Sequence, residues 1–219
     1  MKNFYFRILS IFLILFVASC GGGNSSGGNV MESGNGSISG AWNSSVDSSL
    51  ISSYRTYEYN NNWGLEKIRS AEAYAALSQN GKIADGSGVK VGVADTGVQT
   101  THSDISSNFQ SLGSYDFVNN DSDVSDDNGH GTFISGIIAG VKGNGGIQGV
   151  ASGASLMEAK VLDSAGSGSD SEVVNGINYL ITNNARVINL SLGSDTAVPN
   201  IYNSLVNGKN HEVLFTIPN

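Results

Sequence analysis

The chain has 219 residues, a formal net charge of −8 at pH 7, 29 glycines, two prolines and one cysteine. This length fits one or two domains, and the single cysteine excludes an internal disulfide. The acidic balance, without any cluster of Lys and Arg, argues against nucleic acid as a partner, because phosphate binding requires grouped cations.

Residues 1–19 are predicted to be a signal peptide. Lys2 and Arg7 precede an apolar run over 8–17 that is too short to span a bilayer as a mature helix. The following Val17-Ala18-Ser19-Cys20 resembles the lipobox of bacterial lipoproteins, in which cleavage before the cysteine leaves that residue to carry lipid. We expect lipidation of Cys20 and a membrane-anchored protein of the bacterial cell envelope or surface. A plain signal peptide and a secreted product are the alternative.

Residues 20–55 are predicted to be the lipidated cysteine followed by a flexible linker. Gly, Ser and Asn dominate this stretch, so it offers few apolar side chains whose burial could offset the entropy of ordering the chain. Residues 56–219 carry the hydrophobic patterns of a folded domain.

The folded part begins with a predicted helix over 65–77, where apolar residues recur near the 3.6-residue period, and a buried strand over 89–94. The patterns that follow predict a short strand at 115–118, a helix opening at His130, a strand at 156–162, a helix at 171–184, a strand at 186–190, a short helix at 201–207 and a strand at 213–217. This alternation predicts an α/β fold with a mostly parallel sheet, whose functional residues gather where strands end.

Two short motifs carry candidate chemistry. Asp95 follows the strand at 89–94 directly, and His130 stands between two glycines at the start of the next helix. Asp126, Asp127 and Asn128 are expected to cap that helix. Either motif by itself fits an ordinary turn or a space-filling histidine, but together they are the first two members of an Asp, His and Ser arrangement.

Four sequence blocks occur in one order: 95–98, 130–132, 159–168 and 186–193. In this order and spacing the chain resembles the subtilisin-like serine proteases, the subtilases or peptidase family S8. The resemblance implies a three-layer subtilisin-like α/β fold and a serine endopeptidase that acts on polypeptides. Asp95 would orient His130, which would act as the base. An α/β fold that is not a protease is the alternative.

The same resemblance implies further site residues. Two extended segments would clamp a substrate strand, namely Gly166, Ser167 and Gly168, and Ser191, Leu192 and Gly193. A turn glycine is the simpler interpretation of Gly166. Asn219 lies about where the family places its oxyanion asparagine, and Asp104 where some members hold structural calcium. The acidic stretch at 121–127 offers calcium ligands as well, with a solvated loop as the alternative.

The sequence departs from the family at one point, since it contains no Gly-Thr-Ser motif for the nucleophile. We therefore expect an incomplete catalytic domain, truncated before the nucleophile helix, which carries only the Asp and the His and is inactive as written. No cofactor is required for the chemistry. A non-catalytic surface lipoprotein or pseudoprotease remnant is the alternative.

Overall fold

A computed structural model describes residues 6–8, 46–194 and 198–218 of the chain. Its centre is a parallel five-stranded sheet in the order β3-β4-β2-β6-β8. The strands are β2 (Lys90–Asp95), β3 (Tyr115–Asp116), β4 (Ser155–Lys160), β6 (Val187–Asn189) and β8 (Leu214–Thr216). The predicted strands are all present, but the one expected at 115–118 is shorter.

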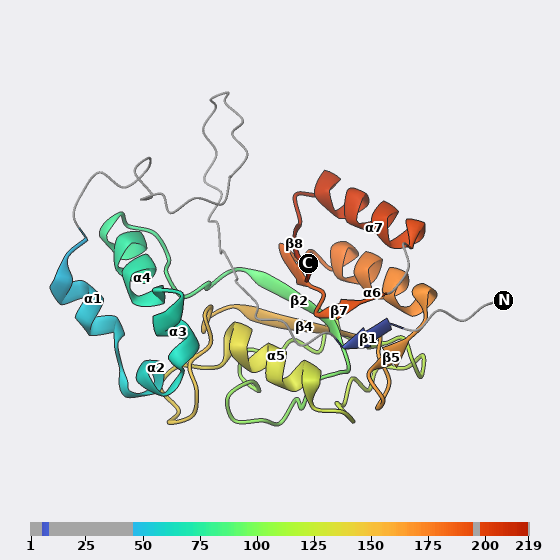
Figure 1. Ribbon diagram of the computed structural model, residues 1–219, viewed down its shortest axis with the longest axis horizontal. Coiled ribbons are helices and arrows are strands. Elements are labelled where there is room, and N and C mark those ends of the chain that lie inside the picture. Colours follow the sequence, from blue (N-terminus) through green and yellow to red (C-terminus); the bar gives the residue numbers. More distant parts are fainter. Residues whose placement is uncertain (1–5, 9–45, 195–197, 219) are drawn as a thin grey trace.

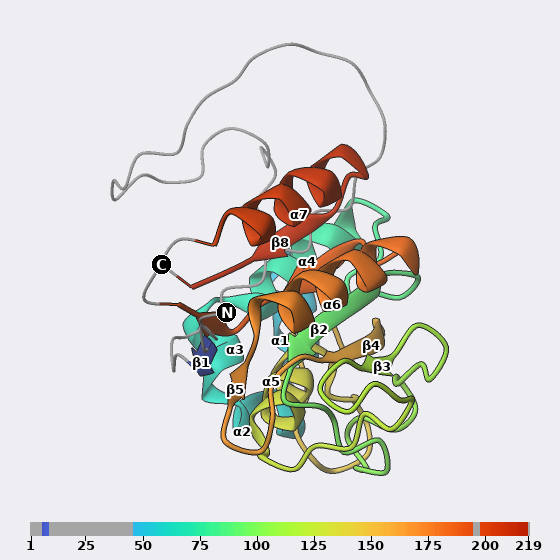
Figure 2. The same ribbon diagram turned by 90° about the vertical axis from the view of Figure 1, so that its right-hand side faces the viewer.

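Helices cover both faces of this sheet. Helix α5 (His130–Ala139) lies on one face, and α6 (Asp170–Thr182) and α7 (Pro199–Asn210) lie on the other, as Figures 1 and 2 show. Side chains alternate along each strand, so Val91 and Val93 pack toward α5 while Met157 and Ala159 pack toward α6. This arrangement confirms the three-layer α/β fold.

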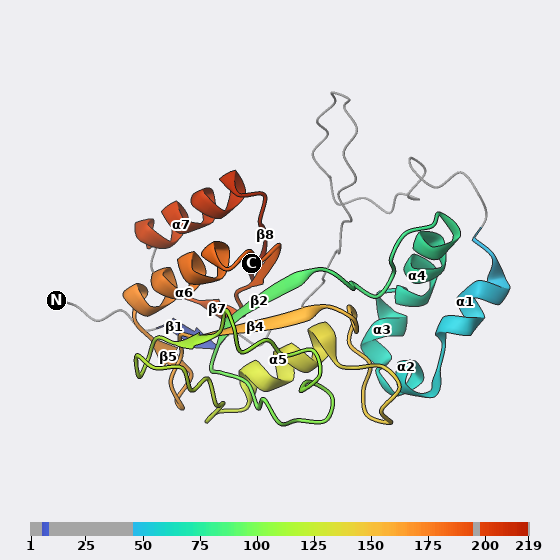
Figure 3. The same cartoon turned by 180° about the vertical axis from the view of Figure 1, so that it is seen from behind.

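Four short helices form a separate cluster beyond the amino-terminal end of β2, seen on the right of Figure 3. They are α1 (Ser48–Tyr54), α2 (Tyr57–Asn61), α3 (Trp63–Lys67) and α4 (Ser70–Gln79). The helix predicted over 65–77 is thus broken in two. Arg69 adopts a left-handed backbone conformation with φ of 58°, which ends one helix and redirects the chain into the next.

Helix α1 lies inside the range expected to be linker. Tyr54 packs its ring on Tyr74 of α4 at 5.4 Å between centroids, and Ile51 contacts the same apolar cluster. These few apolar side chains are enough to order the carboxyl end of a stretch whose composition is otherwise that of a linker.

A second, smaller sheet lies at the carboxyl ends of β4 and β6. Strand β1 (Phe6–Ile8) lies between β5 (Ser167–Gly168) and β7 (Leu192–Gly193) and pairs antiparallel with both. Figure 1 shows this sheet at the end of β2 that is remote from α1–α4. No strand was predicted at Phe6–Ile8, because the sequence there is typical of a signal peptide.

Within the described ranges no helix combines the length and the apolar character that crossing a bilayer requires. Cys20 and Asn219 lie outside the described residues.

Candidate active site

Asp95 is fully buried at the carboxyl end of β2, in the middle of the sheet. Its Oδ1 accepts a hydrogen bond of 2.8 Å from the backbone amide of Thr96 and another of 2.7 Å from Nδ1 of His130. Because the carboxylate can only accept, Nδ1 of the imidazole carries the proton, and Nε2 is left as the basic nitrogen. The structure thus brings the two predicted residues together as a pair.

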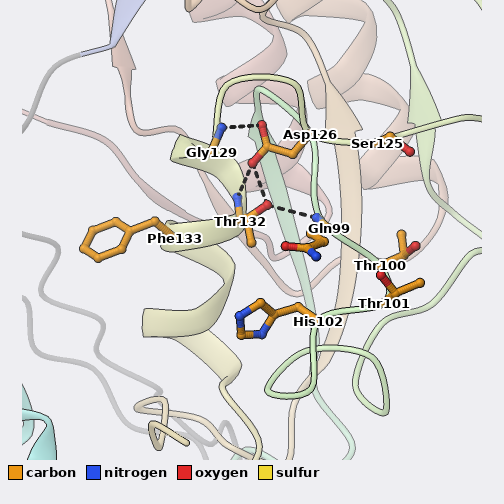
Figure 4. A pocket seen from close by; sticks show the side chains of 9 residues that line it. All are labelled: Gln99, Thr100, Thr101, His102, Ser125, Asp126, Gly129, Thr132 and Phe133. Carbon is orange, nitrogen blue, oxygen red and sulfur yellow. Dashed lines mark hydrogen bonds between the residues drawn. The ribbon is translucent and has the colours of Figure 1, made fainter.

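His130 is the first residue of α5, and its position depends on the loop before the helix. Asn128 Oδ1 accepts from the His130 amide at 3.2 Å. Asp126 accepts from the amides of Gly129 and Thr132 and from the Thr132 hydroxyl, at 2.8, 2.9 and 2.5 Å. Figure 4 shows the bonds of Asp126 to Gly129 and Thr132, which satisfy amides at the helix start that have no partner within the helix. Asp126 and Asn128 therefore cap the helix as predicted, whereas Asp127 binds Lys160 instead.

The helix approaches the end of β2 very closely at Gly131. Its amide donates to the Thr96 hydroxyl at 2.9 Å, and its Cα faces the backbone of Gly97. A side chain at position 131 would overlap the Gly97 carbonyl oxygen and press on the Cβ of Asp95. The glycine after the histidine thus allows the helix to deliver His130 onto the Asp95 carboxylate.

The pair alters the proton affinity of the imidazole. The hydrogen bond that His130 donates to Asp95 raises the pKa of His130 above its ordinary value of 6.5, partial burial acts against this rise, and the charges of Asp95 and Asp126 add to it. The histidine side chain is 16% exposed, so solvent or a ligand can reach it. A base with this arrangement can take a proton through Nε2, and the buried carboxylate at Nδ1 stabilises the imidazolium that results.

The predicted substrate segments face one another across β1. Phe6 and Arg7 pair with Gly168 and Ser167 on one side, and Arg7 and Ile8 pair with Gly193 and Leu192 on the other. The groove between β5 and β7 therefore holds one extended strand through main-chain pairing on both edges. It lies at the carboxyl edge of the main sheet, where Asp95 also lies. Asn128 Nδ2, from the loop before α5, donates to Ser164 O in the turn before β5 at 3.0 Å.

The glycines of this groove have different roles. Gly168 lies in β5 with its Cα against the Val161 carbonyl, so a side chain there would overlap backbone. Gly166 lies outside the strand in a turn, with φ of 71° and its amide bonded to Asp163 O at 2.9 Å. Gly166 is therefore a turn glycine, and its predicted contact with a substrate stays a prediction. Ser191 is buried and accepts a hydrogen bond from Asn189.

A profile of the subtilase family matches residues 86–217 of the chain. The chain belongs to the subtilase family. Thermitase from Thermoactinomyces vulgaris is 44% identical over 132 residues, covering 60% of this chain and 44% of thermitase. The major intracellular serine protease of Bacillus subtilis (strain 168) is 38% identical over 156 residues, covering 69% and 46%.

A solved structure gives the same result. The crystal structure of a cold adapted subtilisin-like serine proteinase matches with a TM-score of 0.55 and 35% identity, covering 61% of this chain and 46% of that one. The chain thus spans less than half the length of these relatives.

The subtilase resemblance implies calcium at Asp104, whose carboxylate is surrounded by hydrogen-bond donors. Asp104 Oδ1 accepts from the Asn144 side-chain amide at 2.9 Å, and Oδ2 accepts from the Ile147 backbone amide at 3.1 Å. Calcium needs six to eight oxygen ligands, whereas N–H donors face both oxygens here. As folded, these residues do not fit a calcium ion, and no step of the chemistry is derived through one.

Glu58 was not identified from the sequence. It is a second carboxylate, in addition to Asp104, that binds the loop 142–147. Glu58 is buried on α2 and accepts from the amides of Gly143 and Gly145 at 2.6 and 2.5 Å. Glu58 and Asp104 together hold the loop 142–147 through its backbone N–H groups. Backbone N–H groups that point at carboxylates bind anions and do not coordinate a cation.

The acidic stretch at 121–127 is likewise bonded to protein groups. Asp127 pairs with Lys160, and Asp121 and Asp123 accept backbone amides two residues further along. In the part of the chain that the structure describes, no group of three or more His, Cys, Asp or Glu is placed to hold a metal ion.

Two buried ionisable residues of β4 were also missed, Glu158 and Lys160. Lys160 Nζ donates to Thr96 O at 2.6 Å, to Asp127 Oδ1 at 2.7 Å and to Leu162 O at 3.2 Å. It thereby ties the ends of β2 and β4 to the loop that leads into α5. The sequence signal was available, since two charged residues alternate within a strand that is otherwise apolar.

A shallow pocket of about 450 Å³ opens beside α5 (Figure 4). Its lining consists of Gln99, Thr100, Thr101, His102, Ser125, Asp126, Gly129, Thr132 and Phe133. Neither Asp95 nor His130 contributes to this lining, so we assign the pocket no part in the reaction.

Proposed function

We propose that this subtilase domain hydrolyses peptide bonds as a serine endopeptidase, with Asp95 and His130 as two members of its triad. The observation that carries the proposal is the 2.7 Å bond between buried Asp95 and His130 Nδ1 at the edge of the sheet where the groove lies. Two of the relatives named above support it, because one is described as a serine protease and the other as a serine proteinase.

In the proposed reaction, His130 Nε2 takes the proton of a serine hydroxyl as the serine oxygen attacks a peptide carbonyl carbon. The imidazolium then gives this proton to the leaving amine nitrogen, and a water molecule repeats the sequence on the acyl-enzyme. Asp95 stays ionised and stabilises the imidazolium. The serine is proposed to come from the part of the family domain that this sequence does not cover.

The groove supports a polypeptide as the substrate. Strand β1 pairs with both β5 and β7, and this pairing supports the proposal that their edges accept one extended substrate backbone. Main-chain pairing of this kind recognises a peptide irrespective of most of its side chains. Phe6–Ile8 belong to the residues predicted to be removed with the signal peptide, and their removal would leave the groove open to a substrate.

Activity-based labelling tests this function. The reading frame that extends across the codon for Asn219 is expressed and treated with a fluorophosphonate probe that reacts with activated serines. We expect labelling that His130→Ala lowers by at least about 10³-fold, because triad members act as a unit. His211→Ala is the matched control, since His211 is exposed and its imidazole bonds to Asn207 O, remote from Asp95 in the sequence. Equal labelling of wild type and His130→Ala, or no labelling of either, would reject the endopeptidase and favour a non-catalytic lipoprotein.

We further propose that the domain is anchored to a bacterial envelope membrane by lipid on Cys20. The support is the sequence pattern of residues 1–20 and the absence of any other cysteine. Cells grown with an alkyne-bearing palmitate should yield a labelled, membrane-bound product, and Cys20→Ser should abolish both the label and the membrane association. A Cys20→Ser protein that still fractionates with membranes would contradict lipid anchoring.

A further inference from the structure

Two buried carboxyl groups near the end of β2 each have one oxygen without a hydrogen-bond partner. They are Oδ2 of Asp95 and Oε1 of Glu158. The first belongs to the carboxylate that holds His130, whose other oxygen accepts two hydrogen bonds. Glu158 plays no part in the chemistry proposed above, although it is almost fully buried. A buried polar oxygen without a partner is costly, so a close pair of them calls for an explanation.

The register of the sheet places the two side chains near one another. Strands β2 and β4 are direct neighbours, with Val93 opposite Glu158 and Asp95 opposite Lys160. Because side chains alternate, Val93, Asp95 and Glu158 all project from the face that packs on α5. Asp95 and Glu158 are therefore diagonal neighbours, a spacing of on the order of 7 Å between backbones that long side chains can bridge.

Two ionised carboxylates in this position would repel each other without solvent to screen them. A single proton on one of the two carboxyl groups removes the repulsion. It also lets that group donate a hydrogen bond to the other, so that both unpaired oxygens gain a partner. Glu158 is the better site for this proton, because Asp95 Oδ1 already accepts hydrogen bonds from the Thr96 amide and from His130.

The surroundings of Glu158 agree with this assignment. Burial raises the pKa of Glu158 well above its ordinary value of 4.5, and the charges of Asp95 and Asp126 raise it further. The Gly97 amide and Lys160 act in the opposite direction. Lys160 is a weak counter-ion for Glu158, since its ammonium is bonded to Asp127 and to two backbone carbonyls.

We propose that Glu158 is a positioning residue for His130: it is an uncharged carboxylic acid whose O–H donates to Asp95 Oδ2 and fixes the Asp95 carboxylate beneath the imidazole. Asp95 is then the single negative charge next to His130, held by a donor on each of its oxygens. This inference concerns the Asp95–His130 pair and does not require that the chain hydrolyses peptides, so its test is independent of the labelling experiment.

The test is a histidine NMR titration of the full chain with Glu158→Gln and Glu158→Met. The glutamine amide keeps a donor without adding charge, whereas methionine has a similar volume and no donor. We expect Glu158→Gln to leave the pKa of His130 within about 0.3 of wild type. Glu158→Met should raise it by about 0.5 or more, because an Asp95 that has lost a donor attracts the imidazole proton more strongly. The exposed His211 serves as the internal reference.

Three results would overturn the proposal. A lower pKa of His130 in Glu158→Gln would mean that Glu158 is charged in the wild type, and identical values in Glu158→Met and wild type would mean that it does not act on Asp95. Infrared spectroscopy gives a readout that does not depend on the methionine variant folding. The carbonyl band of a protonated carboxylic acid should be present in the wild type at neutral pH and lost in Glu158→Gln, and its absence from the wild type would equally refute the assignment.

Discussion

Replacing Gly131 by alanine should destabilise the domain by roughly 3 kcal/mol and separate His130 from Asp95. The added methyl group would overlap the carbonyl oxygen of Gly97 and contact the Cβ of Asp95, and both are fixed by the buried end of β2. Neither group can move away from the added methyl group, because one is the backbone of Gly97 and the other is the buried side chain of Asp95. Denaturant unfolding measures the loss of stability, and the NMR titration of His130 should show its pKa falling toward 6.5 as the bond to Asp95 is lost.

Gly136→Ala, further along the same helix, is the control for this substitution. A methyl group there would meet only Ile147 Cδ1 at 3.6 Å, which is ordinary contact. Since alanine favours helix over glycine, we expect unchanged stability or a gain of up to about 1 kcal/mol. If Gly131→Ala and Gly136→Ala lowered the unfolding free energy equally, the close approach at Gly131 would not be what positions His130.

Asp126→Ala should lower the unfolding free energy by about 2 kcal/mol, because several hydrogen bonds to a charged and partly exposed group are lost together. The carboxylate accepts from two amides at the start of α5, from the Thr132 hydroxyl and from the Thr96 hydroxyl at 2.9 Å. The start of the helix would fray as a result. Faster amide hydrogen exchange at Gly129 and Thr132 is the accompanying signature.

The effect of Asp126 should depend on pH with a definite sign. Burial acts to raise its pKa, but the bonds from Gly129, Thr132 and Asn128 together lower it below the ordinary 3.8. A lowered folded-state pKa stabilises the fold above about pH 4 and loses this contribution as the pH falls through the folded value. The gap in unfolding free energy between wild type and Asp126→Ala should therefore be constant near neutrality and narrow in acid. Asp123→Ala is the matched control from the same loop; a gap of the same size there would contradict a specific role for Asp126.

The sequence was sufficient to predict the α/β fold and the Asp95–His130 pair, and the physical reasons are local. Buried strands appear as apolar runs, and the residue that ends such a run in a parallel sheet lies at the edge where sites form. The flanking glycines of His130 were evident in the sequence, but only the fold shows that Gly131 approaches the backbone of Gly97 closely.

Features that depend on distant parts of the chain were not predictable in this way. The break at Arg69 depends on how α3 and α4 pack, since the periodicity of 65–77 suits one continuous helix. Glu58 and Asp104 come from separate segments, and only the folded chain shows that they bind the same loop through its amides. The partners of Glu158 are likewise set by the register between β2 and β4, which no local pattern encodes.

The strand order has a consequence for how the domain reaches its native state. Each pairing in the main sheet joins strands separated by at least one helix or long loop, so β2 cannot form its ladder until β4 and β6 have been assembled beside it. Domains with such non-local pairing have a high contact order and fold slowly. The unpaired edges of their strands stay exposed for longer during folding. Asp95 ends the central strand of this sheet, so the surroundings that bury its carboxylate are complete only when both neighbouring strands have paired with β2.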